Sequence, residues 1–371
     1  MLLGYIVGFI IILQVYTFEI FKKNPLIKVL SLLLGSFVFY ALLYNVTYNS
    51  DWDAYYNKYY QIAENSDILF NIISSFYLAR GSDYSNVYHF HIVLIGIGFF
   101  YFASRFSYSG ILTIISIYLL FQLVAVSNQI RYFVAFPLFL IAAYNLIVRQ
   151  NKFFFFLWGI LSVSSHLGII LMYPFIYFYY KISSEQYFKK LILYSLVFAG
   201  STYLIYAAFL IYVNFLHFSA YFDQSWLSSF SGGLLNSTIW ILWLVYIFLK
   251  NKRLSVSHSK ALETDIKYQF LYKLSLYTVI FFPASLILQI LCHRYMIASL
   301  IVWIIFIIYS LQYESSLLKR LGAISIFIGL VVVTFIYQYI LPRILIGNAD
   351  FEPIEQIFEL FYSNTFFYKF P

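Results

Sequence analysis

The chain has 371 residues, of which 63% are hydrophobic and only 10% are charged, and its mean hydropathy is +0.82. This composition excludes an ordinary soluble protein and is typical of a polytopic helical membrane protein. The net charge of +8 does not indicate nucleic-acid binding, because Lys and Arg cluster in short gaps between apolar runs. Such clusters mark cytoplasmic loops.

The apolar runs predict an all-α fold of about twelve membrane-embedded helices, with both ends of the chain outside. We expect residues 1–371 to form a single membrane domain without a soluble domain. The first run lacks a basic leader and a cleavage pattern, so we expect a retained helix there. The runs occupy residues 2–18, 26–44, 87–104, 110–126, 130–148, 153–180, 191–216, 234–249, 268–291, 296–311 and 323–341.

The run 153–180 departs from simple alternation across the membrane, because basic residues flank both of its ends. A single span would place Lys181 outside and invert every later loop. A hairpin that breaks near residues 164–166 keeps both ends inside, and we favour it. Its arms of about 13–15 residues are shorter than the roughly 20 needed to cross a bilayer. Its apex would therefore lie below the outer surface, under a water-filled cavity.

The three longer segments expected outside are 45–85, 217–233 and 342–371. The first begins polar and rich in Tyr, and residues 67–80 then have the apolar spacing of a helix lying in the membrane interface. The outer acids include Asp51, Asp53, Glu64, Asp67, Asp83, Asp223, Asp350, Glu352, Glu355 and Glu359. The few outer arginines therefore stand in acidic, aromatic surroundings.

The strongest local signal is residues 127–132, SNQIRY, where one apolar run ends and the next begins. Asn128, Gln129 and Arg131 are polar groups at a depth where lipid contact is costly. The planar guanidinium of Arg131 suits a phosphate or a carboxylate. The alternative is that Arg131 snorkels outward, or pairs with Asp51 or Asp53 and only stabilises packing.

Further polar residues are candidates at the same outer level. His166, at the proposed hairpin apex, could act as an acid, a base or a hydrogen-bond donor, or could simply bond a carbonyl freed by the helix break. Asp51 and Asp53 could be a base and its partner, or solvated loop acids. The remaining candidates for substrate binding are Arg80, Tyr55, Arg294, Tyr295 and Arg343, although arginines at helix ends often only snorkel. With one cysteine, Cys292, and no suitable His or acid spacing, we expect no metal site and no cofactor.

Taken in order, these motifs resemble the EpsG-like branch of the Wzy-type bacterial polysaccharide polymerases. They are the segment DWDAYY at 51–56, the NQIRY at 128–132, the Ser-Ser-His break that ends at His166, and the late Arg294-Tyr295. The resemblance covers about residues 40–300. Members of the family often have Gln where this chain has Tyr132, which leaves the arginine intact.

The resemblance implies a GT-C-like helical membrane fold and glycosyl transfer at the outer face of the bacterial cytoplasmic (inner) membrane. The implied substrates are undecaprenyl-pyrophosphate-linked oligosaccharides, joined into a capsule, exopolysaccharide or O-antigen chain. A flippase and a chain-length regulator of the same pathway are the implied partners, besides the lipid bilayer. In this interpretation Arg131 and Arg294 stabilise the leaving pyrophosphate, His166 supplies a hydrogen bond or proton, and Asp51 or Asp53 acts as the base.

Two other classes of function remain open from the residues. A flippase or other transporter would need cations along a path into the cytoplasmic half, where Lys273 is the single charge within the core of a predicted helix. A glycan ligase or an O-acyltransferase would also act at the membrane, the latter using a histidine.

Overall fold

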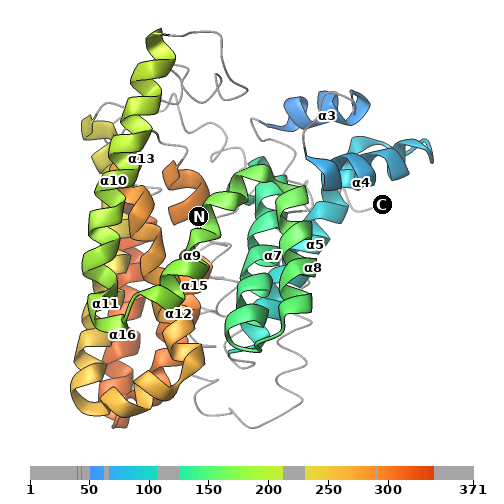
Figure 1. Cartoon of the computed structure of the whole chain (residues 1–371). Helices are drawn as coiled ribbons and strands as arrows, with labels where there is room; N and C mark the ends of the chain where they lie inside the picture. The colour runs from blue at the N-terminus through green and yellow to red at the C-terminus, as the bar shows by residue number, and fades with distance from the viewer. Residues whose placement is uncertain are drawn as a thin grey trace, which may run out of the picture. The chain divides into compact units, whose positions relative to one another are not determined.

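The protein is described from a computed structural model. It describes residues 40, 43, 51–61, 67–106, 125–211, 230–286, 288 and 291–337; for 205–211, 230–232, 235, 236, 293 and 335 it describes the backbone alone. Every element formed by this part of the chain is a helix (Figure 1). The predicted all-α class is therefore confirmed for these residues.

Four helices in the described ranges are long and apolar enough to cross a membrane: Tyr84–Ser104, Ile130–Ile147, Arg294–Tyr313 and Leu317–Thr334. They coincide with four of the predicted apolar runs. The runs 2–18, 26–44 and 110–126 lie almost wholly outside the described residues, and the total of about twelve embedded helices stays a prediction.

The chain divides into two compact units, which we call the first unit (Met1–Tyr173 with Ser325–Pro371) and the second unit (Pro174–Ile324). The helix α16 (Leu317–Phe335) crosses the boundary between them. The other described helices of the first unit are α3 (Trp52–Tyr60), α4 (Ile68–Leu78), α5 (Tyr84–Ser104), α7 (Ile130–Ile147), α8 (Lys152–Ser165) and the 3-10 helix η2 (Leu167–Met172).

Helix α7 is the centre of the first unit and packs against α5 and α8 (Figure 1). Its residues are apolar on nearly all sides, as expected for a helix surrounded by other helices. Gly98 of α5 lies against Pro137 of α7, where an added Cβ would be 2.9 Å from the proline Cβ. On the other side, Ser162 of α8 donates a hydrogen bond to the carbonyl oxygen of Ala135 at 2.8 Å. These contacts allow the helices to approach closely.

A tight turn joins α7 to α8. The side chain of Asn151 accepts a hydrogen bond from the backbone N–H of Phe154 and so caps the start of α8. Its own N–H donates to the carbonyl oxygen of Asn145 at 2.8 Å. Gln150 takes a left-handed conformation with φ of 54° to close the turn. The two helices therefore run in opposite directions, side by side.

Helices α3 and α4 belong to the predicted outer segment 45–85. The indole of Trp52 meets the rings of Tyr84 and Tyr88 edge-on, with centroids 4.9 and 5.1 Å apart, which attaches α3 to α5. Along α4, Ile68, Ile72 and Phe76 are each more than half exposed, at spacings of four residues. Such an exposed apolar stripe suits a helix in the membrane interface. Ile73, the neighbour of Ile72 in the sequence, is buried instead.

The second unit contains α9 to α15. Its elements are α9 (Pro174–Lys181), α10 (Ser184–Ile211), α11 (Phe230–Thr264), α12 (Ile266–Tyr277), η5 (Thr278–Phe281), α13 (Phe282–Ser285), the π-helical turn η6 (Cys292–Met296), α15 (Leu300–Ser310) and η7 (Leu311–Tyr313). The apolar run 268–291 is thus not one regular helix. It changes to a 3-10 turn before Pro283, which has no backbone N–H to donate.

Buried tryptophans form the core of the second unit. Trp240 and Trp243 of α11 both lie against Trp303 of α15, with ring centroids 6.1 and 6.3 Å apart. The indole N–H of Trp303 donates to the carbonyl oxygen of Ser275 on α12 at 3.2 Å. One aromatic cluster therefore connects three helices and satisfies its own polar atom.

Lys273, the charge that the sequence places inside an apolar run, caps a helix. Its Nζ donates to the carbonyl oxygens of Tyr179 and Ile182 at 3.0 and 2.7 Å. These groups lie at the end of α9, where carbonyls lack partners within the helix and a cation is favoured. Lys273 thus joins α9 to α12, which is a structural role.

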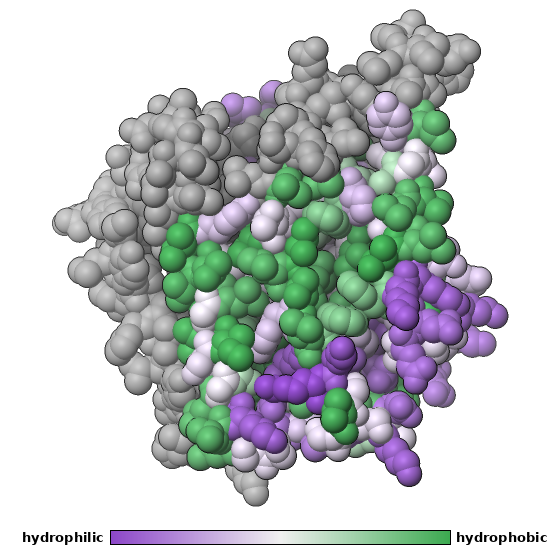
Figure 2. All heavy atoms as spheres, turned by 90° about the vertical axis from the view of Figure 1, so that its left-hand side faces the viewer, coloured by the Kyte–Doolittle hydropathy of each residue, from purple (hydrophilic) through white to green (hydrophobic). Residues whose placement is uncertain are grey.

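The second unit has an apolar surface of the kind that suits a membrane. Figure 2 shows a broad apolar surface with hydrophilic side chains gathered below it. The exposed apolar residues of α10 include Leu193, Leu196, Val197 and Leu204.

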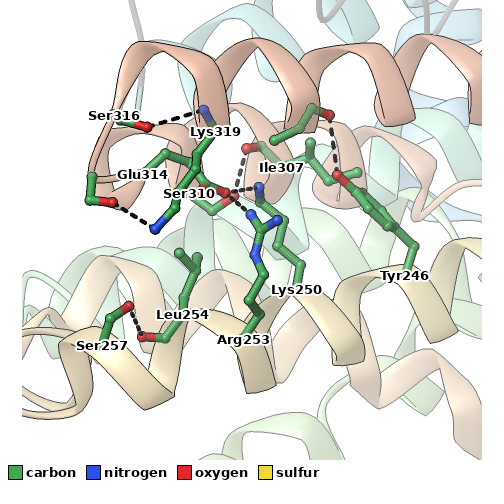
Figure 3. A network of polar contacts seen from close by, with 12 residues as sticks. Tyr246, Lys250, Arg253, Leu254, Ser257, Ile307, Ser310, Glu314, Ser316 and Lys319 are labelled. Atoms are coloured by element: carbon green, nitrogen blue, oxygen red, sulfur yellow. Dashed lines mark hydrogen bonds and ion pairs between the residues drawn. The ribbon is translucent and has the colours of Figure 1, made fainter.

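Near the end of α15, the buried carboxylate of Glu314 accepts bonds from Lys250, at 3.0 Å, and from Arg253 (Figure 3). Burial lowers the pKa of Lys250, although its bond to Glu314 opposes the effect. This cluster ties α11 to the chain that follows α15.

Candidate active site around Asp67

The polar centre of the first unit is Asp67, the residue before α4. A residue at this position usually accepts a hydrogen bond from the first turn of its own helix, but Asp67 makes no such bond. Its carboxylate points instead to α7 and to the end of α8, and its side chain is only 4% exposed. Oδ2 accepts bonds from both Arg131 and His166.

Arg131 reaches this carboxylate from the first turn of α7. Its Nη1 donates to Asp67 Oδ2, and the side chain is 13% exposed. The guanidinium carbon lies 4.8 Å from the ring centre of Tyr55 and 5.7 Å from that of Phe70. Both are within the range of cation–π attraction. An ion pair and two rings thus hold the guanidinium in place.

His166 lies at the break between α8 and η2. Ser164 and Ser165 both donate to the carbonyl oxygen of Leu161, at 3.0 and 2.7 Å, and such bonds compete with the regular helical pattern. His166 then has extended backbone angles, φ −160° and ψ 117°. Its Nδ1 is 3.4 Å from Asp67 Oδ2, and its side chain is 12% exposed. The helix break at 164–166 therefore lies where the sequence predicted it.

The electrostatics of the site favour an ionised Asp67. Burial is the largest influence and raises the pKa of its carboxyl group. The hydrogen bond from His166, the charges of Arg131 and His166, and a backbone bond from Leu167 together outweigh burial and leave the pKa below its usual value. At neutral pH the site therefore contains a buried carboxylate beside a guanidinium and an imidazole.

The sequence does not single out Asp67. It is one of the outer acids, whereas Asp51 and Asp53 are the residues that the sequence offers as partners of Arg131 or as the base. Asp51 precedes α3 and is half-buried, and Asp53 is exposed in the first turn of that helix. No local signal in the sequence distinguishes Asp67 from the other outer acids, because its partners Arg131 and His166 are far away along the chain.

The other predicted residues of the first unit lie at different distances from this centre. Tyr55 contacts the Arg131 guanidinium, as described. Asn128 and Gln129 are half-buried and come directly before α7. Arg80 lies at the far end of α4, exposed, with its guanidinium 3.5 Å from the ring centre of Phe76. The structure therefore brings Arg131, His166 and Tyr55 together, and leaves Arg80 on the surface.

Two predicted residues belong to the second unit. Arg294 is half-buried in the turn η6. Tyr295 is buried and stacks on Phe281 with centroids 4.3 Å apart, so its ring contributes to packing. Arg343 lies outside the described residues. Within the described ranges, no three His, Cys, Asp or Glu side chains gather in the manner of metal ligands.

The model of the EpsG family matches residues 28–345, a range that contains Asp67, Arg131 and His166 and most of both units. No curated protein and no solved structure matches the chain.

Proposed function

The chain belongs to the EpsG family, and on that premise we propose that it is a membrane polymerase of surface polysaccharide. It would join lipid-pyrophosphate-linked oligosaccharide units by glycosyl transfer, without a nucleotide sugar. The observation that best supports this proposal is the Arg131 guanidinium, held beside an imidazole at the end of an apolar helix. Membership of the family indicates a membrane protein of polysaccharide synthesis. The residues of the site suggest that its step in this synthesis is glycosyl transfer.

The chemistry of the step requires a cation at the leaving group. A hydroxyl oxygen of one oligosaccharide attacks the anomeric carbon of the other, and the bond from that carbon to the pyrophosphate breaks. Negative charge then develops on the pyrophosphate, and donors already in position stabilise it most effectively. A guanidinium has five N–H donors in a planar fork, so Arg131 can hold a carboxylate and a phosphate oxygen together.

The position of the site suits a substrate that is half lipid. Asp67 and Arg131 lie where α4 begins, and the exposed stripe of Ile68, Ile72 and Phe76 follows along the same helix. A polar head could bind at the start of α4 while an undecaprenyl tail stays in the bilayer. In this proposal the site faces outward from the cytoplasmic (inner) membrane, and a flippase of the pathway delivers the repeat units.

A deletion strain tests the proposal through the length of its surface glycan. Loss of long chains with single repeat units retained is the expected result. Loss of every surface unit would instead indicate a flippase, and loss of a side group alone would indicate an acyltransferase. Reintroducing the wild-type chain should restore the long chains, whereas Arg131→Ala should not.

A further inference from the structure

The contacts of Asp67 determine which nitrogen of His166 carries a proton. An ionised carboxylate can only accept hydrogen bonds, and the influences described above keep Asp67 ionised at neutral pH. The His166 nitrogen that faces it, Nδ1 at 3.4 Å, must therefore be the donor. In the neutral imidazole the lone pair is then on Nε2, the nitrogen on the far side of the ring from Asp67.

The same carboxylate also fixes the position of the ring. Asp67 accepts a bond from the backbone of Leu167, the residue directly after His166. The ring of Tyr132 meets the imidazole edge-on at 5.7 Å. The backbone N–H of His166 donates to the carbonyl oxygen of Ser162 at 3.2 Å, so the backbone is held on both sides of the His166 Cα and the imidazole has a defined direction. The long Nδ1 contact is of the kind that shortens when substrate binds.

From this geometry we propose that His166 is the general base of the transfer and that Asp67 is its positioning residue. The proposal rests on the proposed function and assigns a role that the sequence had given to Asp51 or Asp53. His166 Nε2 takes the proton of the acceptor hydroxyl as its oxygen bonds to the anomeric carbon. The bond to the pyrophosphate breaks with its electron pair, and the imidazolium later releases its proton to water. Asp67 stays ionised and stabilises the imidazolium.

Asp67 also couples the two halves of the reaction, because one oxygen atom, Oδ2, serves both Arg131 and His166. The cation for the leaving group and the base for the acceptor are therefore held at a fixed separation. Among the residues that the structure describes, the charged and titratable groups that face the imidazole include Asp67 from the start of α4, and Arg131 and Tyr132 from α7. Of the two charged groups, the carboxylate favours the imidazolium and the guanidinium opposes it.

The test is the pH dependence of polymer formation by the purified full chain in liposomes, supplied with lipid-linked repeat units. For the wild-type chain we expect kcat/KM to fall on the acid side as His166 protonates. Asp67→Asn should lower kcat by about 10²-fold or more. The substitution should also move the acid limb to lower pH by about 1 unit, because it removes the adjacent carboxylate, which favours the protonated ring. His166→Gln should remove that limb, and Asp67→Glu, which keeps the carboxylate, should restore part of the rate with a limb near that of the wild type.

Several outcomes would overturn the proposal. One is an acid limb that persists in His166→Gln; another is a limb that moves in Asp53→Asn but not in Asp67→Asn, which would place the base on α3. If Asp67→Asn fails to fold, the His166→Gln and Asp67→Glu profiles decide alone. A wild-type chain that forms no polymer would refute the proposed function itself, which separates that failure from a failure of this inference.

Discussion

At the scale of single residues, Arg131 is held both by a counter-charge and by two aromatic rings. The guanidinium is mostly buried, so it needs a counter-charge, and the Asp67 carboxylate supplies one. The rings of Tyr55 and Phe70 prefer a flat, weakly hydrated cation. The compact ammonium of a lysine would balance the charge of Asp67. It would fit the two rings less well and could not make a bidentate contact to phosphate.

We therefore expect Arg131→Ala to abolish polymer formation and Arg131→Lys to retain only a small part of it, while both proteins insert at normal levels. The matched control is Arg149→Ala, since Arg149 is exposed at the opposite end of α7 and should be dispensable. Polymer length in a complemented deletion strain, with the amount of membrane protein measured beside it, gives the answer. Full activity of the lysine variant would mean that a point charge suffices, and full activity of the alanine variant would reduce Arg131 to a packing residue.

The Asp67 carboxylate should also stabilise the folded protein, and this contribution should depend on pH. Asp67→Asn leaves the Arg131 guanidinium without its buried counter-charge, which costs about 3–5 kcal/mol in such pairs. The folded-state pKa of Asp67 is below its ordinary value of 3.8. Its contribution is therefore fully present above about that pH and is lost as the pH falls through the folded-state pKa.

Thermal unfolding of wild type and Asp67→Asn in detergent, compared between pH 7 and pH 3, measures this contribution. The difference in Tm should be large at pH 7 and should shrink toward pH 3. A difference that stays constant over this range would show that the asparagine acts through shape and not through charge.

The sequence could identify Arg131 and His166 because a polar group within or beside an apolar run is unusual on its own. It could not identify Asp67. An acid in a polar outer segment is ordinary, and its partners are 64 and 99 residues away along the chain. Such long-range pairing depends on how α4 packs against α8, which no local pattern encodes.

At the scale of helices, a glycine lets the backbones of two neighbouring segments approach each other closely. Gly233 of α11 lies against the backbone of Leu286, where an added Cβ would be 2.1 Å from the carbonyl oxygen. The neighbouring Ser237 and Ser285 hydroxyls are 3.1 Å apart, so α11 and α13 meet along this line. The sequence placed Gly233 at the end of an outer loop, and the structure places it within a helix.

Gly233→Ala should therefore destabilise the second unit, because backbone atoms cannot move aside as a flexible side chain can. Gly200→Ala in α10 is the matched control, since nothing lies within 4 Å of the added Cβ. Helix propensity alone should make that change neutral or stabilising, by up to about 1 kcal/mol. Thermal unfolding of the two variants in the same detergent compares them directly. Equal Tm values would contradict the close contact.

At the scale of the whole molecule, composition was enough to predict a helical membrane protein, and the four long apolar helices agree with the predicted runs. Helix α8 is different. Its 14 residues give a length of about 21 Å at 1.5 Å per residue, against about 30 Å for a bilayer core. The basic residues at both ends of the run 153–180 were enough to suggest a hairpin with short arms, of which α8 is the first. The sequence could not provide the Asn151 cap, or the paired serine bonds to Leu161 that end the helix.

The orientation of α7 and α8 in the membrane can be tested with introduced cysteines, in a background where the single buried Cys292 is replaced by Ala. Lys152 lies at the start of α8 and Leu167 just after its end, and both are exposed. With the predicted topology, Lys152→Cys should react with an impermeant thiol reagent only after the cells are permeabilised. Leu167→Cys should react in intact cells. Reaction of Lys152→Cys from outside would invert the topology and remove His166 from the outer face.

The size of the reagent then tests how deep the apex lies. A helix about 9 Å shorter than the bilayer core leaves Leu167 below the outer surface, reachable only through water above it. A small impermeant maleimide should therefore label Leu167→Cys quickly, and a maleimide attached to a large polymer should label it slowly or not at all. Equal rates would place the apex at the surface. No labelling by either reagent would show that water does not reach it, and a polar sugar substrate could not reach His166 by that path.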